Sequence, residues 1–279
     1  MSQDIDYEPA AHYDRVTDAW RLLLGEDLHY GVFATGGEDL PTATAALTAS
    51  MVEASRLEPG LDVLDVGCGN GAPACHLAGT FGVRVVGITT SAVGIALAAE
   101  RAAAAGLARR ATFERRDGMD NGFPAQSFDR AWVLESSHLM RDRPRLVAEC
   151  ARVLRPGGRL VLCDIVRRRE IPFLEVRQRR EEFQTLRAAF GDAHMEPLER
   201  YAELAAASGL VVERLDDLTG ATLPTFDRWR ANAATHQAEV TEALGPDGLE
   251  SFVRSCDILE SLWNDGTFGY GLIAASSLA

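Results

Sequence analysis

The segment Val63 to His76 reads VLDVGCGNGAPACH, and it decides how the surrounding chain is expected to fold. An apolar run that reaches Asp65 predicts a buried strand, and the small and apolar residues after the turn predict the start of a helix. Between them stand Gly67, Gly69 and Gly71. Glycine is needed where the backbone takes a positive φ or where a ligand lies directly against it. Three glycines in five positions therefore predict a ligand-binding turn.

Two classes of ligand fit this turn. Gly67, Gly69 and Ala72 satisfy the G-x-G-x-x-G/A pattern of nicotinamide and flavin sites. Asp65 favours a different ligand, because a pyrophosphate at a helix N-terminus is repelled by a carboxylate whereas an ammonium group is attracted to it. S-adenosylmethionine carries an ammonium and a sulfonium. The next predicted strand, 83–89, ends in GITTS and lacks the acidic residue that binds the ribose in a nicotinamide site. This weakens the nicotinamide interpretation, although many methyltransferases also bind the ribose through an acidic residue there.

Composition limits the class of protein further. With 279 residues and 47% hydrophobic content, the chain can form one domain with insertions or one domain with a cap. A net charge of −13 argues against a nucleic-acid partner, which requires a positive field. The five cysteines show no CxxC or metal-type spacing, so we expect reduced thiols and no metal site. An acidic start and the lack of any run of about 18 apolar residues predict a cytoplasmic protein without a membrane partner.

Strand and helix patterns alternate through the middle of the chain. The strand-like runs lie at 61–66, 83–89, 111–114, 127–134 and 159–165, and the helical runs lie at 72–81, 91–107 and 143–154. Such alternation implies right-handed crossovers and a mainly parallel sheet with helices on both faces, a Rossmann-like doubly wound α/β fold. A ligand then belongs at the carboxyl ends of the strands. The motif RPGG at 155–158 is predicted to stop a helix and turn into the fifth strand.

The flanking regions complete four predicted segments. Residues 1–58 form a helical lead-in with helices at 13–24 and 42–57, and residues 59–165 form the cofactor-binding core. The charged helical stretch 166–209, with its own helix at 197–208, is predicted to be an inserted helical lid. Residues 210–279 return to the core through strands at 210–218 and 267–275, with helices at 224–244 and 246–263 between them. The prediction is a seven-stranded sheet whose last strand is antiparallel.

Four motifs follow one another along the chain: DVGCGNG, RDGMDNGFPAQSFDRAW, ESSHLM and ARVLRPGGRLVLCDI. In this order and spacing the chain resembles a class I S-adenosylmethionine-dependent methyltransferase, most closely the natural-product enzymes of the rebeccamycin sugar O-methyltransferase type. The resemblance covers about residues 28–166 and the C-terminal third in outline. It implies S-adenosyl-L-methionine as cofactor, S-adenosyl-L-homocysteine as product and a small secondary metabolite as methyl acceptor, most of all at a hydroxyl. An N- or C-methyltransferase, or a related fold that binds the cofactor but catalyses a cyclisation, stays open, as does the oligomeric state.

The resemblance also assigns the cofactor contacts. Asp65, Gly67 and Gly69 would hold the methionine amino and carboxylate portion, with Cys68 as a small residue in the same turn. Tyr30 would close over the methionine carboxylate, or it is a core aromatic residue. The other implied contacts follow the second, third and fourth strands: Thr89, Thr90 and Ser91 at the ribose; Asp117, Gly118 and Met119 at the adenine; Leu134 and Glu135 at the sulfonium. Asp117 could instead be only a turn residue, and Glu135 only a helix cap.

His138 is the expected catalytic base. Methyl transfer displaces a good leaving group, so the protein accelerates it mainly by positioning the nucleophile. A hydroxyl acceptor must still lose its proton, and a neutral histidine is suited to accept that proton near pH 7. His138 lies four residues past the fourth predicted strand, and Asp164 lies at the end of the fifth. In the resembling enzymes a His and an Asp at these positions share the work, with the Asp orienting the imidazole or binding the hydroxyl. The alternative is that His138 has no catalytic role and only caps a helix or faces solvent after the strand.

Overall fold

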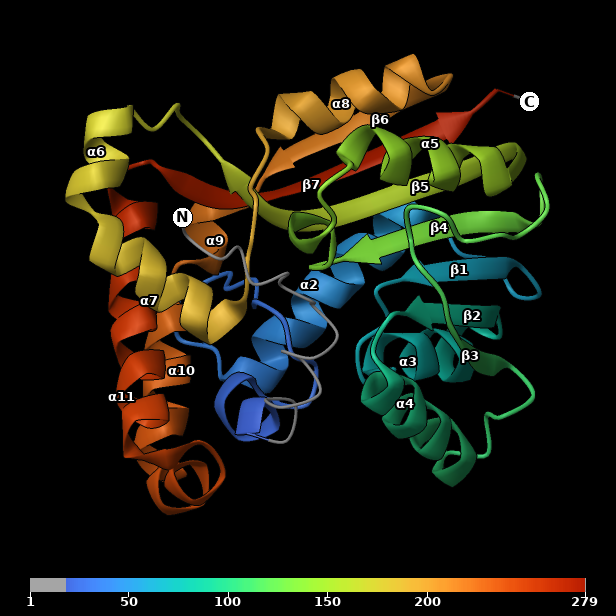
Figure 1. Cartoon of the computed structure of the whole chain (residues 1–279). Coiled ribbons are helices and arrows are strands. Elements are labelled where there is room, and N and C mark those ends of the chain that lie inside the picture. The colour runs from blue at the N-terminus through green and yellow to red at the C-terminus, as the bar shows by residue number, and fades with distance from the viewer. Residues whose placement is uncertain (1–18, 279) are drawn as a thin grey trace, which may run out of the picture.

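Seven strands form one sheet in the computed structural model, which describes residues 19–278. They are β1 (Asp62–Val66), β2 (Arg84–Thr89), β3 (Ala111–Arg115), β4 (Phe128–Leu134), β5 (Leu154–Arg167), β6 (Leu210–Asp217) and β7 (Phe268–Ser277). Their order across the sheet is β3-β2-β1-β4-β5-β7-β6, with the first five strands parallel and β7 antiparallel to both β5 and β6 (Figure 1). The predicted Rossmann-like sheet with an antiparallel last strand is confirmed.

Helices cover both faces of this sheet. One face is covered by α2 (Leu40–Ser55), α3 (Ala72–Phe81) and α4 (Ala92–Ala104), and the other by α5 (Arg143–Val153) and α8 (Leu198–Ala207). The start of α5 shows why these segments are helical. The carboxylate of Asp142 accepts the N–H of Arg145 as an N-cap, and the apolar residues Leu146, Val147 and Cys150 then recur on one buried face.

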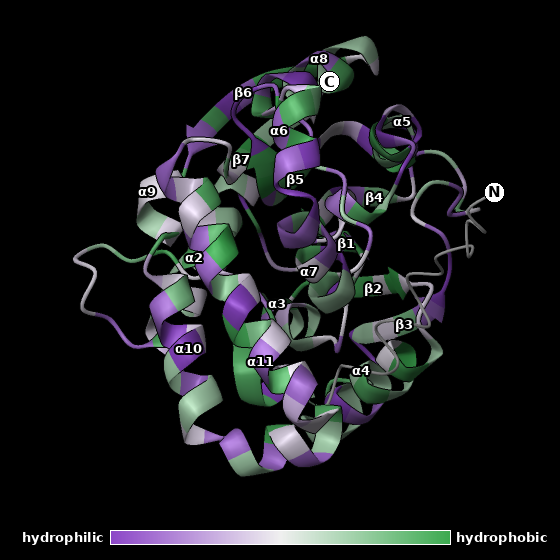
Figure 2. Cartoon of the chain, turned by 60° about the vertical axis from the view of Figure 1, so that its left-hand side comes forward, coloured by the Kyte–Doolittle hydropathy of each residue, from purple (hydrophilic) through white to green (hydrophobic). Residues whose placement is uncertain are grey.

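The remaining helices gather at one side of the sheet. They are α6 (Phe173–Gln178), α7 (Arg180–Phe190), α9 (Thr219–Thr222), α10 (Thr225–Thr235) and α11 (Gln237–Asn264). Figure 1 shows α6, α7, α10 and α11 together, on the opposite side from α3 and α4, and α7 packs against α11. These outer helices alternate hydrophilic and hydrophobic residues (Figure 2), and no helix within residues 19–278 is long and apolar enough to cross a bilayer. The segment predicted as a lid thus contains two outer helices and α8, which packs on the sheet.

Three details differ from the sequence-based expectations. The predicted helix stop before 155–158 is confirmed, since α5 ends at Val153, but β5 begins earlier than predicted: Leu154 already pairs with Phe128, and a register shift follows before Arg159 pairs with Arg130. The predicted helix 224–244 is divided near His236, and Gly245 at φ 77° breaks the regular helix before 246. The lead-in helix is described only from Ala19 to Leu24, and its predicted first part lies outside the described residues. The division of the chain into four segments stays a prediction.

Candidate active site

The glycine turn connects β1 to α3 at the carboxyl edge of the sheet. The N–H groups of Gly67 and Cys68 donate to the carbonyl of Ile88 at 2.8 and 3.1 Å, which fixes the turn against β2. Gly67 has φ 82°, and a Cβ there would lie 2.2 Å from Cβ of Ser136. Gly69 has φ 53°, and no heavy atom of the described residues lies within 4 Å of where its Cβ would be. Packing therefore requires glycine at Gly67, whereas Gly69 presents open backbone to a ligand.

Asp65 lies directly before this turn and is 3% exposed. Its Oδ2 is buried without a hydrogen-bond partner among the described residues. Burial raises the pKa of Asp65 to about 7. A buried carboxylate in this state is stabilised as the anion when a cation binds beside it. The arrangement of an unpartnered carboxylate next to the open backbone of Gly69 fits a ligand with an ammonium group.

The predicted ribose contacts lie at the end of β2. The hydroxyl of Ser91 accepts the N–H of Gly94 at 2.8 Å and caps α4, so this hydroxyl has a structural role. Oγ1 of Thr89 accepts the N–H of Ser91 at 3.3 Å, and the carbonyl of Thr90 accepts Nε of Arg115 at 2.9 Å. The side chain of Thr90 is the exposed one of the three. The ribose roles of these residues stay predictions.

The predicted adenine contacts form a tight turn after β3. Oδ1 of the exposed Asp117 accepts the N–H of Met119 at 2.9 Å. A Cβ on the intervening Gly118 would lie 2.6 Å from Cγ1 of Val66, so glycine is required there by packing against β1. The half-buried Met119 side chain packs on the core beneath the turn. Asp117 therefore has the structural role of a turn residue. Its contact with the adenine stays a prediction.

Glu135 joins three parts of the chain at the end of β4. It follows the buried Leu134 and has an unusual positive φ of 46°. Its Oε1 accepts the N–H of Tyr30 at 2.8 Å and the hydroxyl of Tyr270 from β7. Burial raises the pKa of Glu135 to about 8, and the two hydrogen bonds oppose that rise. The carboxyl is therefore mostly protonated near pH 7 and anchors the segment before α2.

Tyr30 itself lies in an aromatic cluster. Its ring stacks on Trp263 with a centroid distance of 5.5 Å and an interplanar angle of 7°, and it meets Trp229 and Phe226 edge-on. The Tyr30 hydroxyl is buried without a hydrogen-bond partner among the described residues, and burial raises its pKa. This placement matches a core aromatic residue, and the contact with the methionine carboxylate stays a prediction.

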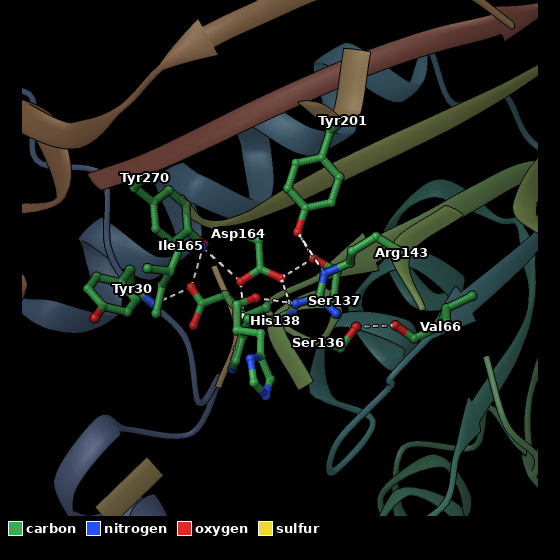
Figure 3. A network of polar contacts seen from close by, with 12 residues as sticks. Tyr30, Val66, Ser136, Ser137, His138, Arg143, Asp164, Ile165, Tyr201 and Tyr270 are labelled. Carbon is green, nitrogen blue, oxygen red and sulfur yellow. Dashed lines mark hydrogen bonds and ion pairs between the residues drawn. The ribbon is translucent and has the colours of Figure 1, made fainter. Parts of the chain in front are cut away.

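His138 and Asp164 are brought together between β4 and β5 (Figure 3). His138 lies in the short 3₁₀ helix η1 (Ser137–Leu139), where its Nδ1 is 2.7 Å from Oδ1 of Asp164 and its N–H donates to Oδ2 at 3.0 Å. Asp164 is fully buried. Burial by itself raises the pKa of Asp164, but His138, Ser137 and Arg143 outweigh it and hold the pKa below its usual value. An ionised Asp164 takes the Nδ1–H of His138, which assigns the free lone pair to Nε2.

Three further residues form a hydrogen-bonded chain that ends at Asp164, and the sequence motifs did not predict them. The hydroxyl of Ser137 donates to Oδ2 of Asp164 at 2.5 Å, the hydroxyl of Tyr201 lies 2.7 Å from Oγ of Ser137, and Nε of Arg143 donates to the Tyr201 oxygen at 3.3 Å (Figure 3). One signal was available for Arg143. It stands three, four and seven positions before the residues that form the apolar face of α5, where a solvated arginine is not expected.

Comparisons with known proteins show which family this chain resembles. A methyltransferase domain family matches residues 64–162. The 27-O-demethylrifamycin SV methyltransferase of Amycolatopsis mediterranei is 32% identical, over 99% of this chain and 98% of the relative. Methyltransferase GfsG of Streptomyces halstedii is 35% identical over 78% of each chain. Among solved structures, the [4+2]-cyclase SpnF matches with a TM-score of 0.83 and 27% identity, covering 97% of this chain and 96% of the cyclase.

The chain therefore belongs to the class I S-adenosylmethionine-dependent methyltransferases. It is a methyltransferase of natural-product metabolism, and S-adenosylmethionine is its methyl donor. The donor fits the residues present, because the unpartnered Asp65 can hold an ammonium group beside the open backbone of Gly69. When bound, it supplies a methyl group on a sulfonium. Within residues 19–278, no three His, Cys, Asp or Glu side chains are grouped as metal ligands.

Proposed function

We propose that this enzyme methylates a hydroxyl group of a small, largely apolar natural product, with His138 as general base. One observation carries the proposal: Nδ1 of His138 is bound by a fully buried Asp164 at 2.7 Å. That contact makes Nε2 the basic nitrogen. A hydroxyl acceptor requires such a base, since an alcohol is a poor nucleophile until its proton is removed.

The residues of the pair have separate tasks. The bound donor would supply the methyl group by cleavage of its S–C bond and would leave as S-adenosylhomocysteine, while Nε2 of His138 would take the proton of the acceptor hydroxyl. The imidazolium that forms is stabilised by the carboxylate of Asp164, which stays ionised because it accepts several hydrogen bonds. A positioned base of this kind contributes typically about 10² to 10⁴ in rate. The fold supplies the rest by holding the acceptor and the donor in line at the strand ends.

Two relatives bear on the type of reaction. The name of 27-O-demethylrifamycin SV methyltransferase gives an oxygen as the methylated atom, and that protein matches this chain over almost its whole length. This likeness supports O-methylation over N- or C-methylation. The likeness to SpnF, a [4+2]-cyclase, supports a second candidate function, in which the site shapes a cyclisation and no methyl group is transferred.

A labelling experiment separates these functions. The full chain is incubated with S-adenosylmethionine labelled with ¹³C in the methyl group and a panel of hydroxylated macrocycles that includes 27-O-demethylrifamycin SV. We expect one product that is heavier by a labelled methyl group, with the carbon resonance of an O-methyl ether. A labelled methyl group on nitrogen or carbon would contradict the proposed atom, and a rearranged, unlabelled product would establish the cyclase instead.

A further inference from the structure

We propose that Arg143, Tyr201 and Ser137 form a chain of positioning residues that fixes the charge and the proton arrangement of the His138–Asp164 pair. The inference rests on the proposed role of His138 and extends it to its neighbour Ser137 in η1 and to residues on two further helices. Arg143 comes from the start of α5, Tyr201 from the middle of α8, and Ser137 from η1, and their polar groups form one hydrogen-bonded chain that ends at Oδ2 of Asp164 (Figure 3).

Counting protons gives this chain a single direction. A serine hydroxyl has one proton, and that of Ser137 goes to Oδ2 of Asp164 at 2.5 Å. Oγ of Ser137 can then only accept from Tyr201, whose hydroxyl lies 2.7 Å away. The Tyr201 oxygen in turn accepts Nε–H of Arg143 at 3.3 Å. Every donor therefore points toward Asp164, an arrangement that is complete only when Asp164 is ionised.

The two buried charges explain why the chain is needed. Arg143 is 2% exposed, and the described residues include no carboxylate within ion-pair distance of its guanidinium. A buried, unpaired guanidinium is strongly destabilising unless an opposite charge balances it. Asp164, fully buried, is that opposite charge, with the hydroxyls of Tyr201 and Ser137 between the two. The proton-accepting power of the pair thus depends on a cation that reaches Asp164 through the hydroxyls of Tyr201 and Ser137.

Arg143 also holds the backbone around His138. Its Nη2 donates to the carbonyl of His194, in the segment between α7 and α8. The backbone N–H of His194 donates to the carbonyl of His138 at 2.8 Å. The segment between α7 and α8 is therefore bound to the main chain of His138. Through Arg143 and Tyr201 it is also connected to Asp164, the partner of His138.

The charge of Arg143 predicts a pH effect. Other groups face the pair from the packed elements: Glu135 after β4, Cys163 on β5, Tyr270 on β7 and Tyr30 before α2. All of these are acids, and Arg143 is the facing cation within the described residues. Removing a positive charge makes the uptake of a proton by the pair easier, so its titration midpoint moves to higher pH.

The test uses the full chain labelled with ¹⁵N in its histidines and saturated with S-adenosylhomocysteine, with the His138 resonances assigned by comparison with His138→Gln. In the wild type we expect the tautomer protonated at Nδ1. In Arg143→Met we expect the midpoint at which the His138–Asp164 pair takes up a proton, followed through these resonances, to move to higher pH by about half a pH unit or more, because Arg143 no longer favours the ionised Asp164. Arg143→Lys keeps the charge and should restore most of the wild-type midpoint. Arg145→Met removes an exposed arginine from the same helix and should change nothing.

Tyr201→Phe provides a second, independent variant in case Arg143→Met does not fold. It removes the donor to Ser137 and should move the midpoint in the same direction by a smaller amount. An unchanged midpoint and tautomer in both folded variants would overturn the proposal. The spectra require no acceptor, so they remain decisive even if O-methylation is not found. Spectra that change as expected, in a protein that transfers no methyl group to any hydroxyl of the panel, would instead locate the fault in the proposed function.

Discussion

The backbone N–H of Tyr30 donates to Oε1 of Glu135 over 2.8 Å, so the segment before α2 is bound to the carboxyl end of β4. The same oxygen accepts the hydroxyl of Tyr270 from β7. Three distant parts of the chain thus meet on one carboxyl at the carboxyl end of β4. Because burial raises the pKa of Glu135 to about 8, this junction is sensitive to pH.

The first prediction concerns that junction. The pKa of Glu135 lies above its usual value of 4.5 in the folded chain, so the folded state binds a proton that the unfolded state releases. Its stabilising contribution is complete below about pH 4.5 and is lost as the pH rises through about 8. Glu135→Gln accepts the same two hydrogen bonds but cannot ionise. Urea unfolding at about pH 5 and about pH 8 should show a smaller loss of stability for the variant than for the wild type; parallel losses would contradict this account.

The second prediction compares two glycines of the same turn. Gly67→Ala places a methyl group 2.2 Å from Cβ of Ser136 and should lower the melting temperature strongly. Gly69→Ala meets no described atom and adds only the cost of a non-glycine residue at positive φ, about 1 kcal/mol. It should fold and yet bind S-adenosylhomocysteine poorly in calorimetry, because the added methyl group takes up space that the ligand needs against the backbone. Normal binding by Gly69→Ala would place the ligand elsewhere.

The third prediction concerns Asp65. Burial raises its pKa to about 7, and a bound ammonium group favours the ionised form. Below about pH 7, binding of S-adenosylhomocysteine should therefore release a proton, and affinity should rise as the pH increases from about 5 to about 7. Calorimetry in buffers of different ionisation enthalpy measures that proton. Asp65→Asn should bind about 10 to 100 times more weakly, without the proton release and without loss of stability in the free protein. Proton-independent binding by the wild type would refute this role.

The fourth prediction concerns the outer helices. Nη1 of Arg179 lies 2.9 Å from Oδ2 of Asp265, which connects the start of α7 to the turn after α11. Arg179→Ala should loosen α7 and raise KM for the acceptor, while the affinity for S-adenosylhomocysteine stays constant. Stability should change by no more than about 1 kcal/mol, since the pair is only partly buried. Arg200→Ala removes an exposed ion pair from α8 and serves as control. Equal acceptor KM values in both variants would show that α7 does not cover the acceptor.

The core of the fold was accessible from sequence for a physical reason. Strand, turn and helix are encoded locally by the apolar run, the glycines and the small residues of the 63–76 segment, and alternation of such units leaves few topologies. His138 and Asp164 could be paired because His138 follows the carboxyl end of β4 and Asp164 comes directly after the last residue of the parallel neighbour β5 that pairs with β4. Positions relative to strand ends are therefore the part of a site that a sequence predicts well.

The rest of the site depends on long-range packing. Tyr201 lies 64 residues from its partner Ser137, on a helix whose position over β6 and α5 no local pattern specifies. Ser91 shows the opposite difficulty, since its hydroxyl serves as the N-cap of α4 although its place in the sequence pointed to the ribose. Local pattern gives the backbone position of such residues, but not the group that their side chains bind.

The most direct test of the central claim is the rate of methyl transfer by His138→Ala. The measurement is kcat with the hydroxyl acceptor found in the labelling experiment, at saturating S-adenosylmethionine, together with the affinity of the variant for S-adenosylhomocysteine. If His138 is the base, kcat falls by about 10² to 10⁴ while that affinity is unchanged. A variant that methylates the same hydroxyl at the wild-type rate would contradict the account.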